Sequence, residues 1–223
     1  MEKYLKDISD GKLYSSNDMV KVGCHDCKGC SACCCDMGES ILLDPMDVWR
    51  LERNLGQSFE QLLAGAIDLH VEDGLILPNL KMAPSATGPK CSFLNEEGRC
   101  SVHPFRPGFC RLFPLGRLYE NGSFQYFLQT HECKKENRTK VKVRKWIDIP
   151  DFGKYEKFVS DWHYFAKEMG QKIKSFGSEG QEKSKALCLY ILKKFYMEPF
   201  DASGDFYEQF NKKLEEAKHA AAA

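Results

Sequence analysis

Six of the eleven cysteines in this chain lie within a short stretch near its start. They are Cys24, Cys27, Cys30, Cys33, Cys34 and Cys35. The first four follow one another at steps of three residues. This spacing lets two thiolates from one short turn bind the same metal atom, and it recurs in zinc and iron–sulfur sites. The sequence therefore predicts a metal centre built from cysteine.

A second group of cysteines follows downstream, each in a motif of its own. Cys91 opens the string Cys-Ser-Phe-Leu, and Cys100 follows it in the next few residues. The string Arg-Pro-Gly-Phe-Cys-Arg-Leu-Phe-Pro spans residues 106–114, and Cys133 stands further on in His-Glu-Cys. Together with the first run, these motifs resemble the YkgJ-like cysteine-cluster family, described as a zinc- or iron-chelating CxxCxxCC domain. The resemblance covers residues 24–133, about half of the chain.

The resemblance implies a ligand set drawn from both regions. The predicted metal ligands are Cys27, Cys30, Cys33, Cys34, Cys91, Cys100, Cys110 and Cys133, with Cys24 next. A relative of the family, flagellin lysine N-methylase, carries a similar cysteine domain and is associated with an iron–sulfur cluster and with methyl transfer. By analogy, the resemblance implies an Fe–S-dependent oxidoreductase or a protein lysine methyltransferase-like activity, although analogy between folds does not assign a reaction.

The residues themselves admit two kinds of centre. A tetrahedral zinc site and a [4Fe–4S] cluster each take four thiolates, so eight cysteines suffice for two sites, or for one site with spare thiols. Three cysteines at two-residue gaps plus one remote cysteine is the ferredoxin arrangement, which favours an iron–sulfur cluster. The three-residue step to Cys-Pro of that arrangement is missing, so Zn²⁺ stays the alternative cofactor. Adjacent Cys33 and Cys34 point in different directions in an extended backbone and can serve neighbouring sites.

Basic side chains stand beside the predicted ligands. Arg106 and Arg111, together with Arg99, can offset the negative charge that thiolates leave around a metal, and we predict that Arg106 and Arg111 are cofactor-binding. The alternative is a structural arginine that donates to turn carbonyls. A basic run over residues 134–145 can contact an acidic partner or nucleic acid, or it can guard the edge of a solvated strand.

Composition limits the class of protein. Lys+Arg and Asp+Glu are both 32, so a formal net charge of zero predicts no general attraction to nucleic acid or to an acidic membrane. The N-terminus has no apolar signal core, and no apolar run approaches the roughly 20 residues of a membrane span. Because clustered Cys-x-x-Cys spacing is also more typical of metal binding than of disulfides, we expect a cytoplasmic protein without a membrane partner.

Turn and cap signals in the middle of the chain predict short elements. Asp44-Pro45 starts a helix that Gly56 ends, and Ser58 with Gln61 resembles the capping box of a second helix that reaches Ala66. The pairs Asp-Gly at 73–74 and Asn-Gly at 121–122 predict hairpins. These elements separate the two cysteine regions and must bring them together.

The second cysteine region and the two ends of the chain predict elements of other kinds. Residues 91–100 predict a tight hairpin, residues 101–114 a turn-rich segment with at most one helical turn, and residues 140–149 a strand. Residues 1–23 are polar and read as a loosely packed arm. From Lys154 onward, apolar residues recur at helical spacing and predict helices, of which two cover about 181–197 and 205–217.

The sequence therefore predicts an α+β fold: a compact cysteine-rich core of short hairpins and helices, followed by a C-terminal helical layer. The predicted domains are a metal-binding domain over residues 1–150, with its motif core at 24–133, and a helical extension over residues 151–223.

Several common enzyme signatures are missing from the sequence. It has no radical-SAM spacing, no G-x-G-x-x-G, no P-loop and no H-E-x-x-H. Catalysis would therefore come from the cysteine-bound metal or from a pocket without a motif. We predict an iron–sulfur protein that serves redox or methyl-transfer-like chemistry, with a protein substrate or a redox partner. The alternative is a non-enzymatic structural zinc module that mediates a protein interaction.

Overall fold

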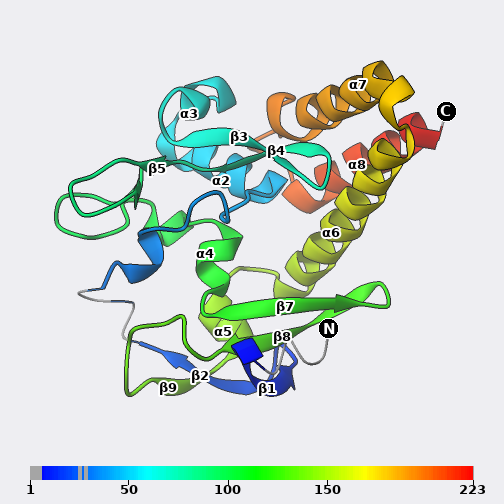
Figure 1. Cartoon of the computed structure of the whole chain (residues 1–223). Helices are drawn as coiled ribbons and strands as arrows, with labels where there is room; N and C mark the ends of the chain where they lie inside the picture. Colours follow the sequence, from blue (N-terminus) through cyan, green and yellow to red (C-terminus); the bar gives the residue numbers. More distant parts are fainter. Residues whose placement is uncertain (1–6, 25–26, 28–29, 223) are drawn as a thin grey trace. The chain divides into compact units, whose positions relative to one another are not determined.

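The computed structural model describes residues 7–24, 27 and 30–222. Short antiparallel sheets and helices alternate along the first two thirds of the chain, and helices fill the last third, which confirms the predicted α+β class (Figure 1). The chain divides into two compact units, each made of two segments. Unit 1 comprises Met1–Gly38 and Met82–Tyr155, and unit 2 comprises Glu39–Lys81 and Glu156–Ala223. The division into a metal-binding domain over residues 1–150 and a helical extension over residues 151–223 stays a prediction.

A three-stranded antiparallel sheet lies in unit 1, in the order β1-β8-β7. Its strands are β1 (Ser9–Tyr14), β7 (Leu115–Glu120) and β8 (Ser123–Gln129). Asn121 and Gly122 join β7 to β8 and both have positive φ, as a two-residue hairpin turn requires. The hairpin predicted at Asn121-Gly122 is thereby confirmed.

A second, two-stranded sheet pairs β2 (Met19–Gly23) with β9 (Thr139–Lys142). Gly23 lies where the two strands approach most closely. A Cβ at this position would meet the Thr139 hydroxyl and would lie 2.9 Å from Val141 Cγ2 and 3.3 Å from the Thr139 carbonyl oxygen. Strand β2 ends at Gly23, and the cysteine run begins with the next residue, Cys24.

Two predictions fail at these strands. Residues 1–23 are not a loose arm over their described part, because β1 and β2 pair with β8 and β9, and Val20 and Val22 are buried. The strand predicted over 140–149 ends at Lys142, where helix α5 (Val143–Ile147) begins. Val143 and Ile147 are both fully buried at a spacing of four, so helical burial replaces the alternation that the sequence suggested.

The second cysteine region folds into very short elements. Strands β5 (Met82–Ala83) and β6 (Lys90–Cys91) pair, and the predicted hairpin follows with Leu94 opposite Cys100. The 3₁₀ helix η2 (His103–Phe105) and helix α4 (Gly108–Leu112) come next. The segment is therefore more helical than predicted. Pro104 occupies the first turn of η2 and Pro107 precedes α4, where a helix loses no hydrogen bond to the missing N–H, and Pro114 follows the end of α4.

Unit 2 opens with two capped helices, α2 (Pro45–Leu55) and α3 (Phe59–Gly65). Both form a complete capping box, from Asp44 to Asp47 and from Ser58 to Gln61. The N-cap predicted at Asp44 and the box predicted at Ser58 are thereby confirmed, and the Asp47 half of the first box is an addition. Gly56 ends α2 in the left-handed region with φ of 65°. The hairpin of β3 (Ile67–Glu72) and β4 (Leu75–Leu80) turns through Asp73 and Gly74, which confirms that prediction too.

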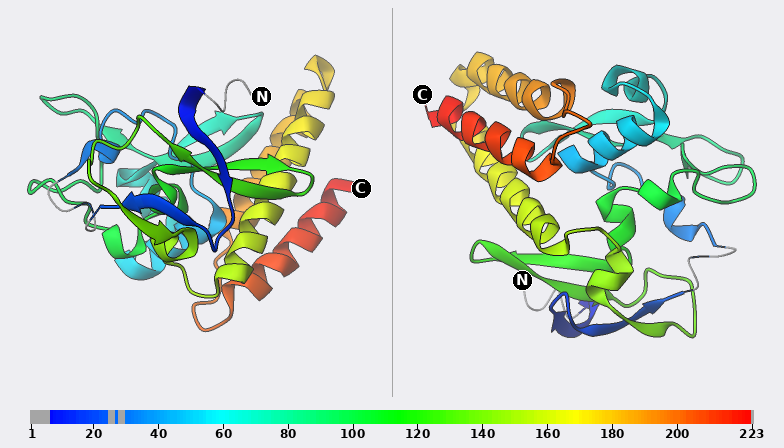
Figure 2. Two further views of the ribbon diagram at one scale, coloured as in Figure 1. Left: turned by 90° about the horizontal axis from the view of Figure 1, so that it is seen from below. Right: turned by 180° about the vertical axis from the view of Figure 1, so that it is seen from behind.

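The C-terminal helices supply the aromatic core of unit 2. They are α6 (Phe152–Ser175), the 3₁₀ turn η3 (Ser178–Gly180), α7 (Gln181–Leu192), the π-helical turn η4 (Lys193–Met197) and α8 (Phe206–Ala222). Figure 2 shows α6, α7 and α8 side by side. Phe210 packs edge-on against Phe158 with ring centroids 4.6 Å apart, and Phe195 lies 5.0 Å from Trp162. In the described part of the chain, none of the helices combines the length and the apolar character that crossing a membrane needs.

Candidate metal centre

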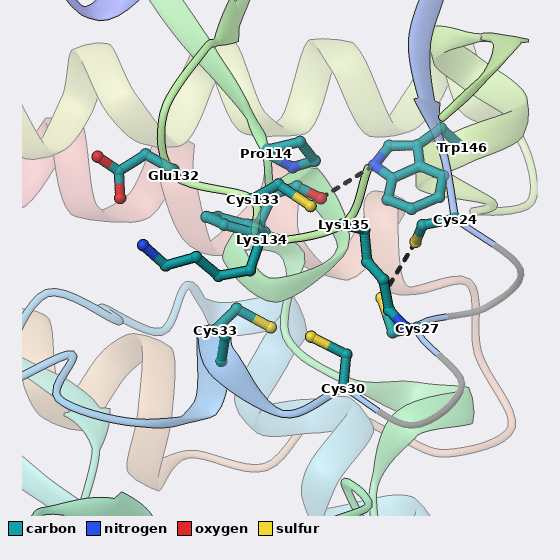
Figure 3. Close-up of a pocket in the computed structure, with 12 residues that line it drawn as sticks. Cys24, Cys27, Cys30, Cys33, Pro114, Glu132, Cys133, Lys134, Lys135 and Trp146 are labelled. Atoms are coloured by element: carbon teal, nitrogen blue, oxygen red, sulfur yellow. Dashed lines mark hydrogen bonds between the residues drawn. The ribbon is translucent and has the colours of Figure 1, made fainter. Parts of the chain in front are cut away.

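A small cavity in unit 1 is lined by five cysteines from two distant parts of the sequence (Figure 3). They are Cys24, Cys27, Cys30, Cys33 and Cys133. The structure thus brings the remote Cys133 to the same cavity as the run of cysteines at steps of three.

Local backbone structure explains how the first run reaches the cavity. Strand β2 ends at Gly23, so Cys24 follows directly from a paired strand. Cys27 has a positive φ of 55°, and its carbonyl accepts a hydrogen bond from the Cys30 amide at 3.0 Å. The 3₁₀ helix η1 (Ala32–Cys34) then turns the chain, so that Cys30 and Cys33 face one another in Figure 3.

Two contacts fix the first turn of this run. The Cys24 and Cys27 sulfurs lie 3.3 Å apart, within reach of a thiol hydrogen bond. The Arg99 guanidinium donates to the Cys27 carbonyl oxygen at 3.0 Å, from a segment 72 residues away. The second cysteine region is therefore tied to the first by a side chain that lies next to Cys100.

A second group of cysteines gathers around η1 and the hairpin that follows β6. Cys35 forms a β-bridge with Lys90, the neighbour of Cys91, and Cys100 lies opposite Leu94 in the hairpin. The Leu94 amide donates to the Cys91 carbonyl at 2.9 Å. Burial raises the pKa of both Cys91 and Cys100, and Cys33 raises each further because its thiolate charge is near. Cys33, which lines the cavity, is therefore electrostatically close to this second group as well.

The thiols of the first run have strongly unequal acidities. The Cys34 thiol donates a hydrogen bond to the Cys33 sulfur, which lowers the pKa of Cys33 to about 7 and raises that of Cys34. Burial, followed by the hydrogen bond with Cys24, raises the pKa of Cys27 to about 12. Because the thiolate is the form that binds metals, Cys33 is the thiol best prepared to do so near neutral pH.

The two predicted cofactor-binding arginines have different surroundings. The Arg106 charge offsets part of the rise in the pKa of Cys27 and of Cys100 and adds to the lowering at Cys33, while its Nη1 donates to the His103 carbonyl at 2.8 Å. Arg111 is 3% exposed, and its guanidinium donates to the carbonyls of Arg106 at 3.1 Å, of Ile147 at 3.3 Å, of Asp148 at 3.2 Å and of Pro104. Arg106 thus lies electrostatically close to the thiols, and Arg111 ties turns together, the alternative role that the sequence left open.

The cavity wall also contains residues that the sequence did not predict at the metal centre. Trp146 lines it, and its indole N–H donates to the Phe113 carbonyl at 3.1 Å. Lys134 and Lys135 line it beside Cys133. The adjacency of the two lysines to Cys133 was visible in the sequence, whereas the place of Trp146 depends on α5, which was predicted as strand.

The predicted ligands are thus divided. Among the described residues, Cys34, Cys91, Cys100 and Cys110 do not line the cavity. Cys110 is half-buried in α4. Within the same described residues, no three His, Cys, Asp or Glu side chains converge closely enough to hold one metal ion. The donor chemistry nevertheless fits a metal that prefers thiolates, because soft sulfur ligands surround one cavity with compensating cations nearby.

Cysteines arranged in this way define a class of protein, the small metal-chelating domains whose ligands are thiols. A model of the CxxCxxCC family, described as a "Putative zinc- or iron-chelating domain", matches residues 26–143. The match covers more than half of the chain, and the chain belongs to this family. Searches with this chain found no match among the curated proteins or the solved structures. Family membership supports metal binding by the cysteines, and Cys24 lies just outside the matched residues.

Proposed function

We propose that this protein holds an iron–sulfur cluster of the [4Fe–4S] type and uses it in redox chemistry or in a methyl-transfer-like modification of a protein. One observation carries the proposal: Cys133 lines the same cavity as Cys27, Cys30 and Cys33. Three cysteines at two-residue gaps with one remote cysteine is the ligand pattern of ferredoxin-type clusters. Cys24 is a fifth thiol in the same wall.

The charges around the cavity support an anionic guest. Thiolates bound to a cluster leave net negative charge, and the reduction potential of a cluster depends on net charge and hydrogen bonds around it. Lys134 and Lys135 line the cavity, and the Arg106 charge favours the thiolate form of two of its cysteines, adding to the lowered pKa of Cys33 and offsetting part of the raised pKa of Cys27. These cations would favour the reduced state of a bound cluster, because reduction adds a negative charge.

The remaining wall residues have a separate task. Phe113, Pro114 and Trp146 present apolar surface to the cavity. An apolar shell around a metal site limits solvent access and so tunes its potential. The chain's own part in the chemistry is therefore to supply thiolates, to balance their charge and to exclude water.

The first experiment is anaerobic purification of the whole chain, followed by visible absorption and by iron, zinc and acid-labile sulfide analysis of one sample. We expect brown protein with iron and sulfide. Cys133→Ser is expected to lose most of both, whereas Cys188→Ser, outside the cavity and buried in α7, is expected to keep them. Colourless protein with stoichiometric zinc and no sulfide would reject the cluster. For iron–sulfur protein, binding of a methyl donor then separates group transfer from electron transfer.

The alternative is a structural zinc module that presents a surface to a partner. One observation favours it: the elements around Cys91 are very short, with β5 and β6 two residues each. Such small strand pairs are marginal by themselves, and structural zinc contributes folding free energy directly. In that case, zinc removal would unfold the cysteine segments, and no redox signal would accompany metal binding.

A further inference from the structure

A strip of positive charge lies on the exposed face of the β2–β9 sheet. Along both strands the side chains alternate, and Val20 and Val22 point into the core. The residues on the opposite, exposed face are Met19, Lys21, Lys140 and Lys142. We call these four residues the basic strip. The strip joins Lys21 to part of the basic run that the sequence showed, from a strand more than a hundred residues away.

The strip contains a pairing that costs stability. Lys21 lies directly opposite Lys140 in the antiparallel register, and Met19 lies opposite Lys142. Like charges directly opposite one another destabilise a sheet. Within the described part of the chain, Lys21, Lys140 and Lys142 form no ion pair that would compensate for this. The molecule thus holds uncompensated cations together although its total formal charge is zero.

The strip also leads to the cysteine cavity. Strand β2 runs into Cys24, and the segment that precedes β9 carries Cys133, Lys134 and Lys135, which line the cavity. The charge therefore extends along both strands toward the cavity wall. A guard against edge-to-edge aggregation would need lysines on the strand edges, but it would not need them beside the cavity.

We propose that the basic strip docks an acidic segment of a partner protein and delivers it to the cysteine cavity. Complementary charge is the argument for such an occupant, and the half-exposed Met19, at 49%, adds the apolar contact that is enriched in protein interfaces. A nucleic acid fits less well, because neither β2 nor β9 carries an aromatic ring on which a base could stack. The inference rests on the proposed function only in taking the cavity as the partner's destination.

The test uses the full chain, purified anaerobically, with its metal content measured in every sample. The probe is a fluorescein-labelled dodecaglutamate peptide, and binding is followed by fluorescence anisotropy at low salt and at physiological ionic strength. We expect binding that weakens steeply with salt, as exposed charges are screened beyond a Debye length of about 8 Å. A glycine–serine peptide of equal length should not bind.

Two double variants isolate the strip. Lys21→Glu/Lys140→Glu keeps a like-charge pair in the ladder, so the sheet should be no less stable, yet peptide affinity should fall about tenfold or more, which is about 1.4 kcal/mol. Lys183→Glu/Lys185→Glu makes the same charge change at exposed positions of α7 and should change affinity less than about twofold. Both variants should retain the metal.

Three outcomes would overturn the inference. They are absence of peptide binding at low salt, an equal loss in both double variants, and tighter binding of a labelled dodecathymidylate than of the peptide. The last would assign the strip to nucleic acid. Because metal content is measured on the same samples, failure of docking leaves the metal assignment standing, and a metal-free protein with intact docking would reject only the proposed function.

Discussion

The aromatic core of unit 2 and the cysteine region of unit 1 are stabilised by different means. In unit 2, Phe158, Trp162, Phe195 and Phe210 are buried and in ring contact with one another. In the cysteine region, η1 and η2 contain no buried residue, and most of the thiols are only half-buried. Hydrophobic burial can hold the first without help. Because η1 and η2 bury no residue of their own, we infer that the second depends on its guest.

Metal removal should separate the two regions most strongly. After the metal is identified, a matching chelator is expected to abolish amide hydrogen-exchange protection in residues 30–35 and 90–105, because those short elements lose the ligand that joins them. Protection in α6 and α8 should stay unchanged. Hydrogen exchange with mass spectrometry measures both regions in one sample. Equal protection of the cysteine segments before and after chelation would show that they do not depend on the metal.

Phe210→Ala should give the next largest effect, in the opposite region. Phe210 is 0% exposed and contacts four aromatic rings, so its removal should cost about 3–5 kcal/mol of unfolding free energy. Urea unfolding measures the loss, and the metal content of the folded variant should not change. Leu189→Ala, at a position that is 49% exposed on α7, is the control and should stay within about 0.5 kcal/mol of wild type.

A smaller effect is expected at the first helix cap of unit 2. The Asp44 carboxylate accepts from the Asp47 amide at 2.9 Å, and the Asp47 carboxylate accepts in turn from the Asp44 amide at 3.2 Å. Asp44→Ala should cost about 1 kcal/mol, the usual loss for an N-cap. Asp44→Ser should recover most of it in the same urea titration, and a variant with full stability would show that tertiary packing alone holds α2.

The smallest effect should be a gain in unit 1. Lys21→Glu converts the like-charge pair with Lys140 into an opposite-charge pair, which is expected to stabilise the β2–β9 sheet by about 0.2–1 kcal/mol. The same change should weaken binding of the acidic peptide. Thermal unfolding at low and high salt tests the first expectation, since the gain should shrink as salt screens the pair. A loss of stability would mean that Lys21 has a packing role.

Sequence reasoning succeeded where the signal is local. The N-cap at Asp44, the capping box at Ser58 and the hairpin turns at 73–74 and 121–122 depend on a few adjacent residues, and all four are present. It failed at β1 and β2 because their partners, β8 and β9, lie more than a hundred residues away. The residues of a short polar segment do not indicate that a distant strand pairs with it.

The centre shows the same division. Residue type and spacing identified the cysteines, and the remote Cys133 was among the predicted ligands. Which thiols share the cavity could not be read from the sequence, because the separation of Cys33 from Cys34 depends on the turn of η1 and on the bridge between Cys35 and Lys90. Trp146 was missed with α5, whose two buried residues are too few to give a helical pattern.

Gly23 has a consequence for mutational tolerance. At Gly56, φ is 65° and a Cβ would meet no atom within 4 Å, so asparagine can replace glycine at little cost, because the constraint is one of conformation. At Gly23 the constraint is one of volume, since Thr139 and Val141 already occupy the space. In a saturation library selected for metal loading, we therefore expect position 56 to tolerate a few residue types. Position 23, one residue before Cys24, should tolerate glycine alone.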